Sequence, residues 1–421
     1  MLELNSASAP VTPSCIGLYY NQVQRHNALP FPCEPTMTYR SNKSFSVLFA
    51  LLFCLSFVCC DVRGQFPEFE HKVIDPALDK VCYGLTLADV NHDKKIDLVA
   101  VSNRAVYWYE NPSWKRRTII ADQTIKDNVC IAPYDIDGDG KVDFALGAGW
   151  TGTGTIQWLS RSDSLDKKWN VHAIGKIRWT HRMRFADVLG NGKAQLVVSP
   201  LNKVAGSGVQ LTAFEIPENP KKDRWKSTVL NEQFNRMHNH WHLDFDKDGL
   251  VDTVTASQEG IHLIQKSASG FRTKKLSELA AGEIKFGKAA GGMRLFATIE
   301  PMHGNQAVAY SMQNGETKRV VLEDKLKQGH AVWLVNLDSD PEDEIVIGHR
   351  EAGTGKVKGP GLYVFDFDSK KEKWTKHIID DGGCAVEDAL AADFDGDGRM
   401  DLAAGGRATH NVKIYFNRKK K

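Results

Sequence analysis

Four aspartates near the C-terminal end of the chain are spaced in a way that suits a metal ion. In the segment ADFDGDGRMDLAAG, residues 392–405, oxygen ligands and glycines alternate at Asp393, Asp395, Gly396, Asp397, Gly398 and Asp401. Carboxylates around flexible glycines let a short loop fold over one hard cation, and calcium accepts about 6–8 oxygens in irregular geometry. Ala404 stands where an EF-hand would have its closing glutamate, and an apolar run leaves the loop. The segment therefore predicts a calcium loop between two strands.

The strand–loop–strand pattern recurs along the chain, at intervals of roughly 40–60 residues that are typical of repeat architectures. Seven loops begin at Asp89, Asp135, Asp187, Asp244, Thr298, Asn336 and Asp393. Besides the last loop, four others carry oxygen ligands: Asp89, Asn91, Asp93 and Asp97; Asp135, Asp137, Asp139 and Asp143; Asp244, Asp246, Asp248 and Asp252; Asn336, Asp338, Asp340 and Glu344. The loop at Asp187 has Leu189 and Gln195 where acids belong. The one at Thr298 keeps only apolar strands, at 295–297 and 307–310. We expect four or five structural calcium ions.

Further short segments indicate a third and a fourth strand in most repeats. They are rich in β-branched and aromatic residues, are bounded by Gly, Asn and Asp, and show no helical period. Tryptophans recur at one position before the fourth strand, as packing anchors: Trp114, Trp169, Trp225 and Trp374. Segment 69–75 resembles the fourth strand at 374–380, and the chain ends on a third strand at 412–416. The sequence thus predicts an all-β, seven-bladed β-propeller over residues 65–421, whose N-terminal strand completes the last blade.

The repeats also reveal a layer of residues that could do chemistry. Six positions before the loop anchors stand Tyr83, Val129, His181, His238, Gly292, His330 and Glu387. Six strand residues span about 20 Å, so this layer lies at the rim opposite the calcium loops. Because the first strand of a propeller blade lines the central channel, we expect the three histidines and the glutamate to converge there. His240 and His242 follow His238 at strand spacing, so all three should share one face.

Three imidazoles and a carboxylate match zinc, manganese or iron better than calcium. Such a metal would polarise a carbonyl group, and a spare histidine would serve as base; the candidate catalytic residues are His181, His238, His240, His330 and Glu387. Polar residues expected at the same rim are candidates for substrate binding: Tyr83, Arg104, Trp150, Lys203, His349, Arg350 and Arg407. Two alternatives stay open, a metal-free histidine site for a ligand and a polar channel that holds only ordered water.

With its repeated Asp-rich loops, the chain resembles the FG-GAP/VCBS repeat family, the calcium-loop propellers of secreted proteins and of the integrin alpha head. The aromatic third strand followed by Glu-Asn-Pro at 108–112 is similar to the propeller part of aldos-2-ulose dehydratase, a lyase that acts on keto-sugars. This resemblance implies a metal-dependent carbohydrate lyase or dehydratase. The alternative is a non-catalytic module that binds a glycan or a protein in adhesion. Adhesion needs no histidine layer, so the layer favours an enzyme acting on a carbohydrate or another small polar ligand.

Residues 1–64 differ from the rest of the chain. Residues 45–60 are sixteen uncharged and mostly apolar residues after Arg40 and Lys43, which indicates a signal peptide rather than a membrane span; Met37 is a possible true start. We therefore expect a secreted, extracellular or periplasmic protein without a stable membrane span in its mature part. Its three remaining cysteines are too few for a disulfide framework. A net charge of +2 gives no argument for nucleic acid as a partner, and the oligomeric state is open.

Overall fold

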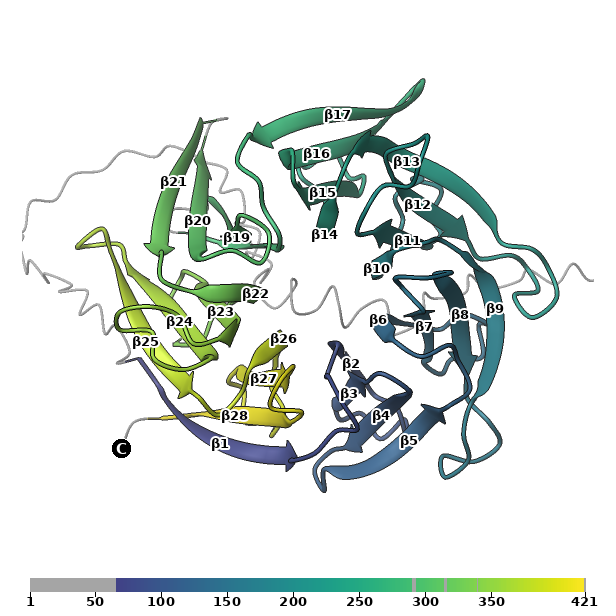
Figure 1. Cartoon of the computed structure of the whole chain (residues 1–421), viewed down its shortest axis with the longest axis horizontal. Coiled ribbons are helices and arrows are strands. Elements are labelled where there is room, and N and C mark those ends of the chain that lie inside the picture. Colours follow the sequence, from purple (N-terminus) through teal and green to yellow (C-terminus); the bar gives the residue numbers. More distant parts are fainter. Residues whose placement is uncertain (1–65, 290–292, 314–315, 339, 420–421) are drawn as a thin grey trace, which may run out of the picture.

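Seven four-stranded antiparallel sheets form a closed ring around a central channel (Figure 1). A computed structural model describes residues 66–289, 293–313, 316–338 and 340–419, and the regular structure of these residues is entirely β. The predicted seven-bladed propeller is therefore confirmed. The predicted leader at 1–64 lies outside the described residues. Within them, no helix is long and apolar enough to cross a membrane.

The blades follow one another along the chain. Blade 1 consists of β2 (Gly84–Ala88), β3 (Asp97–Val101), β4 (Ala105–Glu110) and β5 (Lys115–Ala121). Blade 2 consists of β6 (Asn128–Tyr134), β7 (Asp143–Ala148), β8 (Thr155–Ser160) and β9 (Asn170–Lys176). Blade 3 consists of β10 (Thr180–Ala186), β11 (Gln195–Pro200), β12 (Val209–Glu215) and β13 (Lys226–Phe234). Blade 4 consists of β14 (Met237–Leu243), β15 (Asp252–Ser257), β16 (Gly260–Ser267) and β17 (Gly270–Ser277).

The remaining blades complete the ring. Blade 5 consists of β18 (Ile284–Lys288), β19 (Arg294–Glu300), β20 (Gln306–Gln313) and β21 (Glu316–Glu323). Blade 6 consists of β22 (Lys327–Val335), β23 (Glu344–Glu351), β24 (Gly361–Asp368) and β25 (Lys373–Asp381). Blade 7 consists of β26 (Val386–Ala392), β27 (Asp401–Gly406), β28 (Val412–Arg418) and β1 (Glu68–Asp75). As predicted, the N-terminal strand closes the ring, pairing along β28 from Glu68–Arg418 to Asp75–Val412.

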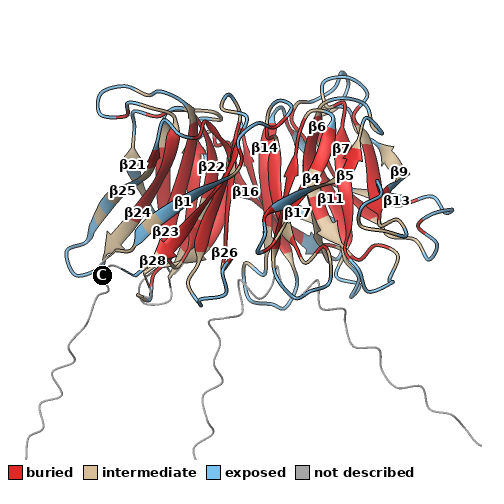
Figure 2. Ribbon diagram, turned by 90° about the horizontal axis from the view of Figure 1, so that it is seen from below, coloured by how far each residue is buried: buried red, intermediate tan, exposed pale blue. Residues whose placement is uncertain are grey.

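The hydrophobic core lies between the blades. Seven buried clusters each join two neighbouring blades; one, for example, packs Leu98 and Tyr109 of blade 1 against Ile414 of blade 7. Buried residues accordingly run along the strands, while the connections at both rims are exposed (Figure 2). Trp114, Trp169, Trp225 and Trp374 each pack against the preceding blade, as the anchor interpretation predicts. Cys82, Cys130 and Cys384 are buried free thiols.

The Asp-rich loops connect the first and second strands of their blades. In the last loop Gly396 and Gly398 have φ angles of 75° and 84°, which glycine adopts without strain. The final acid fastens the loop, because the Asp401 carboxylate accepts hydrogen bonds from the backbone N–H groups of Phe394 (2.9 Å) and Asn417 (2.7 Å). The final acids of the other acidic loops bind the N–H that follows the loop anchor in the same way.

The fifth repeat differs from the prediction. Segments 295–297 and 307–310, expected to be its first and second strands, belong to β19 and β20, which are the second and third strands of blade 5. Its first strand is β18, and the loop that follows begins at Ala289. Thr298 is therefore no loop anchor but a buried strand residue. The sequence at 289–293 contains no acid, so the strand pattern of this repeat points one strand too late.

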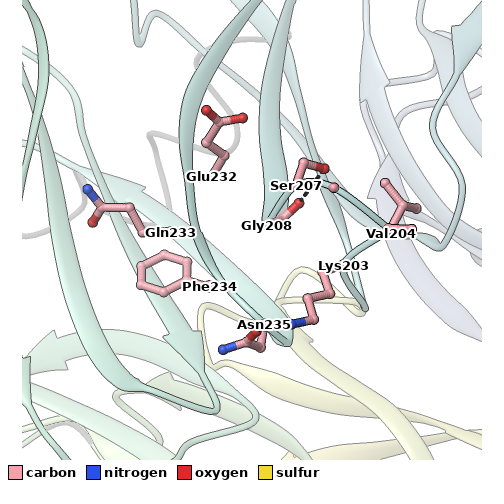
Figure 3. A pocket seen from close by; sticks show the side chains of 10 residues that line it. Lys203, Val204, Ser207, Gly208, Glu232, Gln233, Phe234 and Asn235 are labelled. Carbon is pink, nitrogen blue, oxygen red and sulfur yellow. Dashed lines mark hydrogen bonds between the residues drawn. The ribbon is translucent and has the colours of Figure 1, made fainter.

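An open hollow of about 640 Å³ lies between the β11–β12 connection and the end of β13 (Figure 3). Lys203 lines it, and its Nζ donates a hydrogen bond to Asn235 Oδ1 at 2.6 Å. Lys203, predicted to bind substrate at the channel rim, thus belongs to a separate surface feature of blade 3.

Candidate metal centre

β-Bulges mark the predicted layer in five first strands. The pairing register shifts across Val129, His181, His238, His330 and Glu387, so each of these residues is the extra residue of a bulge. A bulge re-aims the side chain and ends regular pairing, and bulges are common beside functional sites. All five lie at the start of the innermost strands, at the rim opposite the Asp-rich loops.

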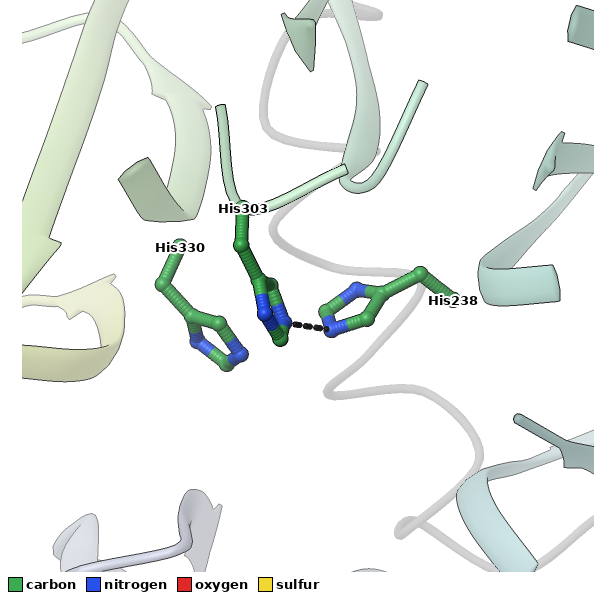
Figure 4. Close-up of side chains that lie close together, drawn as sticks. All are labelled: His238, His303 and His330. Atoms are coloured by element: carbon green, nitrogen blue, oxygen red, sulfur yellow. Dashed lines mark hydrogen bonds between the residues drawn. The ribbon is translucent and has the colours of Figure 1, made fainter. Parts of the chain in front are cut away.

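Three histidines meet at this rim. His238 and His330 come from the bulges of β14 and β22, and His303 comes from the β19–β20 connection (Figure 4). One ligand nitrogen from each lies within 4.8 Å of the others. The closest pair is His238 Nε2 and His303 Nε2, 2.8 Å apart. Three elements far apart in sequence thus place three imidazole nitrogens around one point.

A short contact to a carboxylate and a hydrogen bond, on the far sides of two rings, indicate which nitrogen faces that point. His238 Nδ1 lies 2.9 Å from Glu283 Oε1. His330 Nδ1 bonds to the backbone carbonyl of Glu387, which can only accept. Both rings therefore carry their proton on Nδ1, and Nε2 presents its lone pair to the cluster. His330 Nε2 is buried and has no hydrogen-bond partner within the part of the chain that the structure describes.

The three imidazoles are neutral. Burial lowers the pKa of His238, and Glu283 offsets this only in part. Burial, Arg350 and the neighbouring histidines hold the pKa of His330 well below its usual value. Burial and His238 lower the pKa of His303 to about 2. Neutral imidazole is the form that binds metals. His303 Nε2 donates to His238 Nε2 in this arrangement, so its proton would have to move to Nδ1 before this nitrogen acts as a ligand.

A buried carboxylate supports His238. Glu283 receives Arg182 Nη2 at 3.2 Å and the side-chain amide of Asn239. Burial alone would raise the pKa of Glu283, but Arg182 and His238 outweigh it and hold the carboxyl ionised. A carboxylate behind a ligating histidine orients the ring and raises its basicity. The residues therefore fit one divalent transition metal, provided that the His238 and His303 rings turn slightly apart.

The structure corrects the predicted role of Glu387. Its carboxylate, expected in the histidine layer, is held by Arg350 Nη2 at 2.7 Å and Arg407 Nη1 at 3.0 Å. Only its backbone carbonyl reaches the cluster, through His330. Glu283 supplies the carboxylate instead. It stands six positions before Ala289, so it occupies the predicted layer once blade 5 is aligned by its true first strand.

The two remaining histidines take different places. The His181 ring lies 4.6 Å from that of His238, and its Nδ1 donates to the His238 carbonyl at 3.1 Å. His240 faces away from the cluster and contacts Ser199 Oγ at 3.1 Å. His240 and His242 share a face as expected, with ring centres 5.0 Å apart, but His238 does not share it, because the bulge at His238 turns it and Asn239 together toward Glu283.

The other predicted rim residues are dispersed. Tyr83 Oη donates to Asp127, Arg104 is exposed and paired with Asp122, and Trp150 packs near Trp179 and His181. His349 is buried against Tyr363, with its Nδ1 on the Glu351 carbonyl. Of this set, Arg350 and Arg407 meet on Glu387, and the Arg407 guanidinium also lies over the Tyr83 ring, 5.9 Å from its centre.

One channel residue escaped the sequence reasoning altogether. Lys285 stands two positions after Glu283 and is buried, with its Nζ 4.6 Å from the ring centre of Trp241 and 5.5 Å from that of Trp333. Burial and Arg184 lower the pKa of this lysine to about 7. Because the sequence pattern places the fifth repeat one strand too late, it predicts neither Lys285 nor Glu283 as a channel residue.

Acidic clusters that could hold a cation occur in four of the predicted loops. Carboxylate oxygens lie within 4.8 Å of one another in these sets: Asp135, Asp137 and Asp143; Asp244, Asp246 and Asp248; Asp338, Asp340 and Glu344; Asp393, Asp395 and Asp401. The first loop folds alike, since its Asp89 carboxylate accepts hydrogen bonds from the backbone N–H groups of Asp93 and Lys94 as Asp244 does from Asp248 and Gly249. In the third loop Gln195 takes the place of the final acid.

Comparison with known proteins agrees with this architecture. Residues 89–146 match the FG-GAP-like repeat, and residues 152–313 match "Aldos-2-ulose dehydratase, beta-propeller domain". The resemblance predicted from the sequence is thus confirmed, and the propeller is related to that of a sugar-processing enzyme. No curated protein matches the chain. A solved structure of an Agrocybe aegerita lectin, described as recognising non-reducing terminal N-acetylglucosamine, is 13% identical, with 84% of this chain and 86% of that one covered at a TM-score of 0.47.

Proposed function

We propose that His238, His303 and His330 bind one divalent transition metal and that a carbohydrate binds at this metal, where it undergoes a lyase or dehydratase reaction. The observation that carries the proposal is the orientation of the rings. The contacts of Nδ1 in His238 and His330 leave Nε2 facing inward, and the buried Nε2 of His330 has no hydrogen-bond partner among the described residues. Such a nitrogen is costly unless something binds it.

The ligand type limits the choice of metal. Three imidazole nitrogens suit zinc, and also manganese or iron, while calcium prefers oxygen ligands. A bound metal would supply Lewis-acid polarisation of a sugar carbonyl. The chain's own contribution is to hold the three rings, to exclude bulk water from their inner faces and to keep Glu283 ionised behind His238.

The match of residues 152–313 to the dehydratase propeller supports a carbohydrate ligand and an elimination reaction. A second candidate function is carbohydrate binding without catalysis. One observation favours it: burial and Arg182 hold the pKa of His181 well below its usual value, which makes this histidine a weak base.

An assay with zinc-loaded protein separates the two candidates. Elimination of water from a keto-sugar breaks a C–H and a C–O bond and leaves a C=C bond conjugated to the carbonyl group, which absorbs ultraviolet light. Absorbance that rises with zinc and not after chelation supports the enzyme. Zinc-dependent binding of the sugar without turnover supports the binding module. Neither binding nor turnover of any keto-sugar or polysaccharide contradicts both.

We expect Glu283→Gln to weaken the metal site without unfolding the ring. The amide keeps the shape of the side chain but loses the charge that raises the basicity of His238. Loss of such an outer partner typically costs about 10–100-fold in metal affinity. Competition with a chromophoric chelator measures this change. Glu232→Gln, at the hollow of blade 3, is the control and should keep wild-type affinity.

We further propose that calcium occupies the acidic loops, where it would stabilise the first two strands of each blade. Secretion through the predicted leader would bring these loops to a calcium-rich medium. Without an ion, burial raises the pKa of Asp97 and Asp401 to about 7 and that of Asp143 to about 8. The ionised form of these acids is thus disfavoured in the folded protein, and a bound divalent cation would stabilise it.

The effect of calcium on thermal stability should grow with pH. The folded-state pKa values of about 7–8 lie above the unfolded value of about 3.9. These carboxyls therefore stabilise the folded state most at low pH. In protein freed of calcium by a chelator, this stabilisation is lost as pH rises toward 8. Calcium binds the ionised form, so its increment in Tm should be larger at pH 8 than at pH 5. The difference in Tm with and without calcium is the quantity to compare. The buried histidines, whose pKa values are lowered, make the stability of the protein itself rise with pH. Equal Tm values with and without calcium at pH 8 would contradict calcium binding.

A further inference from the structure

A cavity beside the histidine cluster presents two arginines. It has a volume of about 440 Å³ and lies between blades 6 and 7, where β22 begins, β23 ends and β27 connects to β28. Arg350 and Arg407 line it, together with Gln328, Glu351 and His410.

One carboxylate holds both guanidinium groups. Glu387 is buried; Arg350 reaches it through Nε at 2.5 Å and Nη2 at 2.7 Å, and Arg407 through Nη1 at 3.0 Å. Arg350 is therefore fixed in a two-pronged contact. The Arg407 side chain is 41% exposed, lines the cavity and gives one nitrogen to Glu387, while its guanidinium lies 5.9 Å from the ring centre of Tyr83.

The balance of charge around the cavity is positive. Glu351, the one acid among the described residues that line the cavity, pairs with Lys327 at 2.8 Å. The two arginines share the single carboxylate of Glu387. The surplus is one positive charge, carried on a guanidinium whose geometry matches a carboxylate.

The cavity is connected to the histidine cluster through one residue. The backbone carbonyl of Glu387 accepts the hydrogen bond that fixes His330, while its side chain holds the two arginines. A sugar bound with one group on Arg407 would therefore lie beside the ring of His330. The arginines are placed to recognise part of whatever ligand reaches the histidines.

We infer that this cavity binds the carboxylate of an acidic saccharide, so that the ligands of the site are sugars containing uronic acid. This inference rests on the proposed carbohydrate function and narrows its substrate class. A surplus of one charge matches a singly charged carboxylate better than a doubly charged phosphate. Sulfated sugars carry a similar charge in a different, tetrahedral group, and the test below separates them.

Calorimetric titration with three matched oligosaccharides tests the inference: oligogalacturonate, neutral oligogalactose and sulfated oligogalactose of equal length. Wild-type protein is expected to bind oligogalacturonate at least tenfold more tightly than the other two, and this preference should shrink as salt is added. Arg407→Gln is expected to lose about tenfold in affinity for oligogalacturonate, as expected for one charge-assisted hydrogen bond. Arg407→Lys keeps the positive charge but loses the planar guanidinium. Its affinity for oligogalacturonate should lie between those of the wild-type protein and Arg407→Gln.

Arg236→Gln serves as the matched control. Arg236 is another exposed arginine at this rim, with its Nε on Asn202 Oδ1 at 2.9 Å, and it does not line the cavity. An equal loss of affinity in this variant would mean a diffuse charge effect and would overturn the inference. Equal affinity for the three oligosaccharides, tighter binding of the sulfated one, or no binding of oligogalacturonate would also overturn it.

Metal content is measured on the same samples. Wild-type protein that holds a transition metal but shows no acidic preference contradicts only the carboxylate site. Protein that prefers oligogalacturonate without holding a metal contradicts only the metal proposal.

Discussion

Replacing His238 by alanine is expected to abolish transition-metal binding and to leave the ring folded. The variant removes one of three nitrogen ligands, so the loss of affinity should exceed the roughly 10–100-fold expected for an outer partner such as Glu283. It also removes the group that Glu283 supports and the hydrogen-bond partner of His303. Emission spectrometry on dialysed protein gives the metal content, and circular dichroism reports the fold.

His242→Ala is the control for this experiment. It makes the same change on the same strand, at a ring whose Nδ1 contacts Thr253 Oγ1 at 3.0 Å rather than the cluster. Metal content should stay at the wild-type level in this variant. If both variants lose the metal, or if His238→Ala keeps it, the histidine cluster is not the site.

The largest loss of stability is expected from Asp380→Ala. Asp380 is buried at the end of β25 and joins blade 6 to blade 7, where its carboxylate accepts bonds from Lys413 Nζ and Tyr415 Oη. Removal of the carboxylate leaves the buried Lys413 ammonium without a counter-ion. Breaking a buried pair in this way costs about 3–5 kcal/mol. Urea denaturation of the calcium-loaded protein measures the change in the free energy of unfolding.

Two comparisons make this result specific. Tyr415→Phe removes one hydrogen bond and keeps the ion pair, so it should cost about 1 kcal/mol. Glu316→Ala, an exposed acid on the outer strand of blade 5, should change the free energy of unfolding by less than about 0.5 kcal/mol. A cost for Asp380→Ala no larger than that for Tyr415→Phe would show that the buried pair contributes little to the junction between the blades.

Most of the fold could be predicted because its signals are local and repeated. Acidic loops set the position of each first strand, and alternating aromatic and β-branched segments mark the strands that follow. Blade 5 was misaligned because the connection after β18 has no acids to mark it. Pairing of β18 with β19 reveals the true order, and this pairing depends on contacts that no short sequence pattern encodes.

The candidate site was predictable only where it follows the repeat. Counting back from the loops reaches His181, His238 and His330. His303 lies in the connection between the second and third strands, whose length differs from blade to blade, so no register points to it. The bulges were also invisible in the sequence, although they decide that His238 turns inward while His240 turns toward Ser199.

The most direct test of the central claim is an anomalous-scattering experiment on crystals soaked in zinc and measured at the zinc edge. A single strong peak is predicted at bonding distance from the Nε2 atoms of His238, His303 and His330. Peaks confined to the acidic loops, with none among the three imidazoles, would contradict the claim that these histidines form a metal centre.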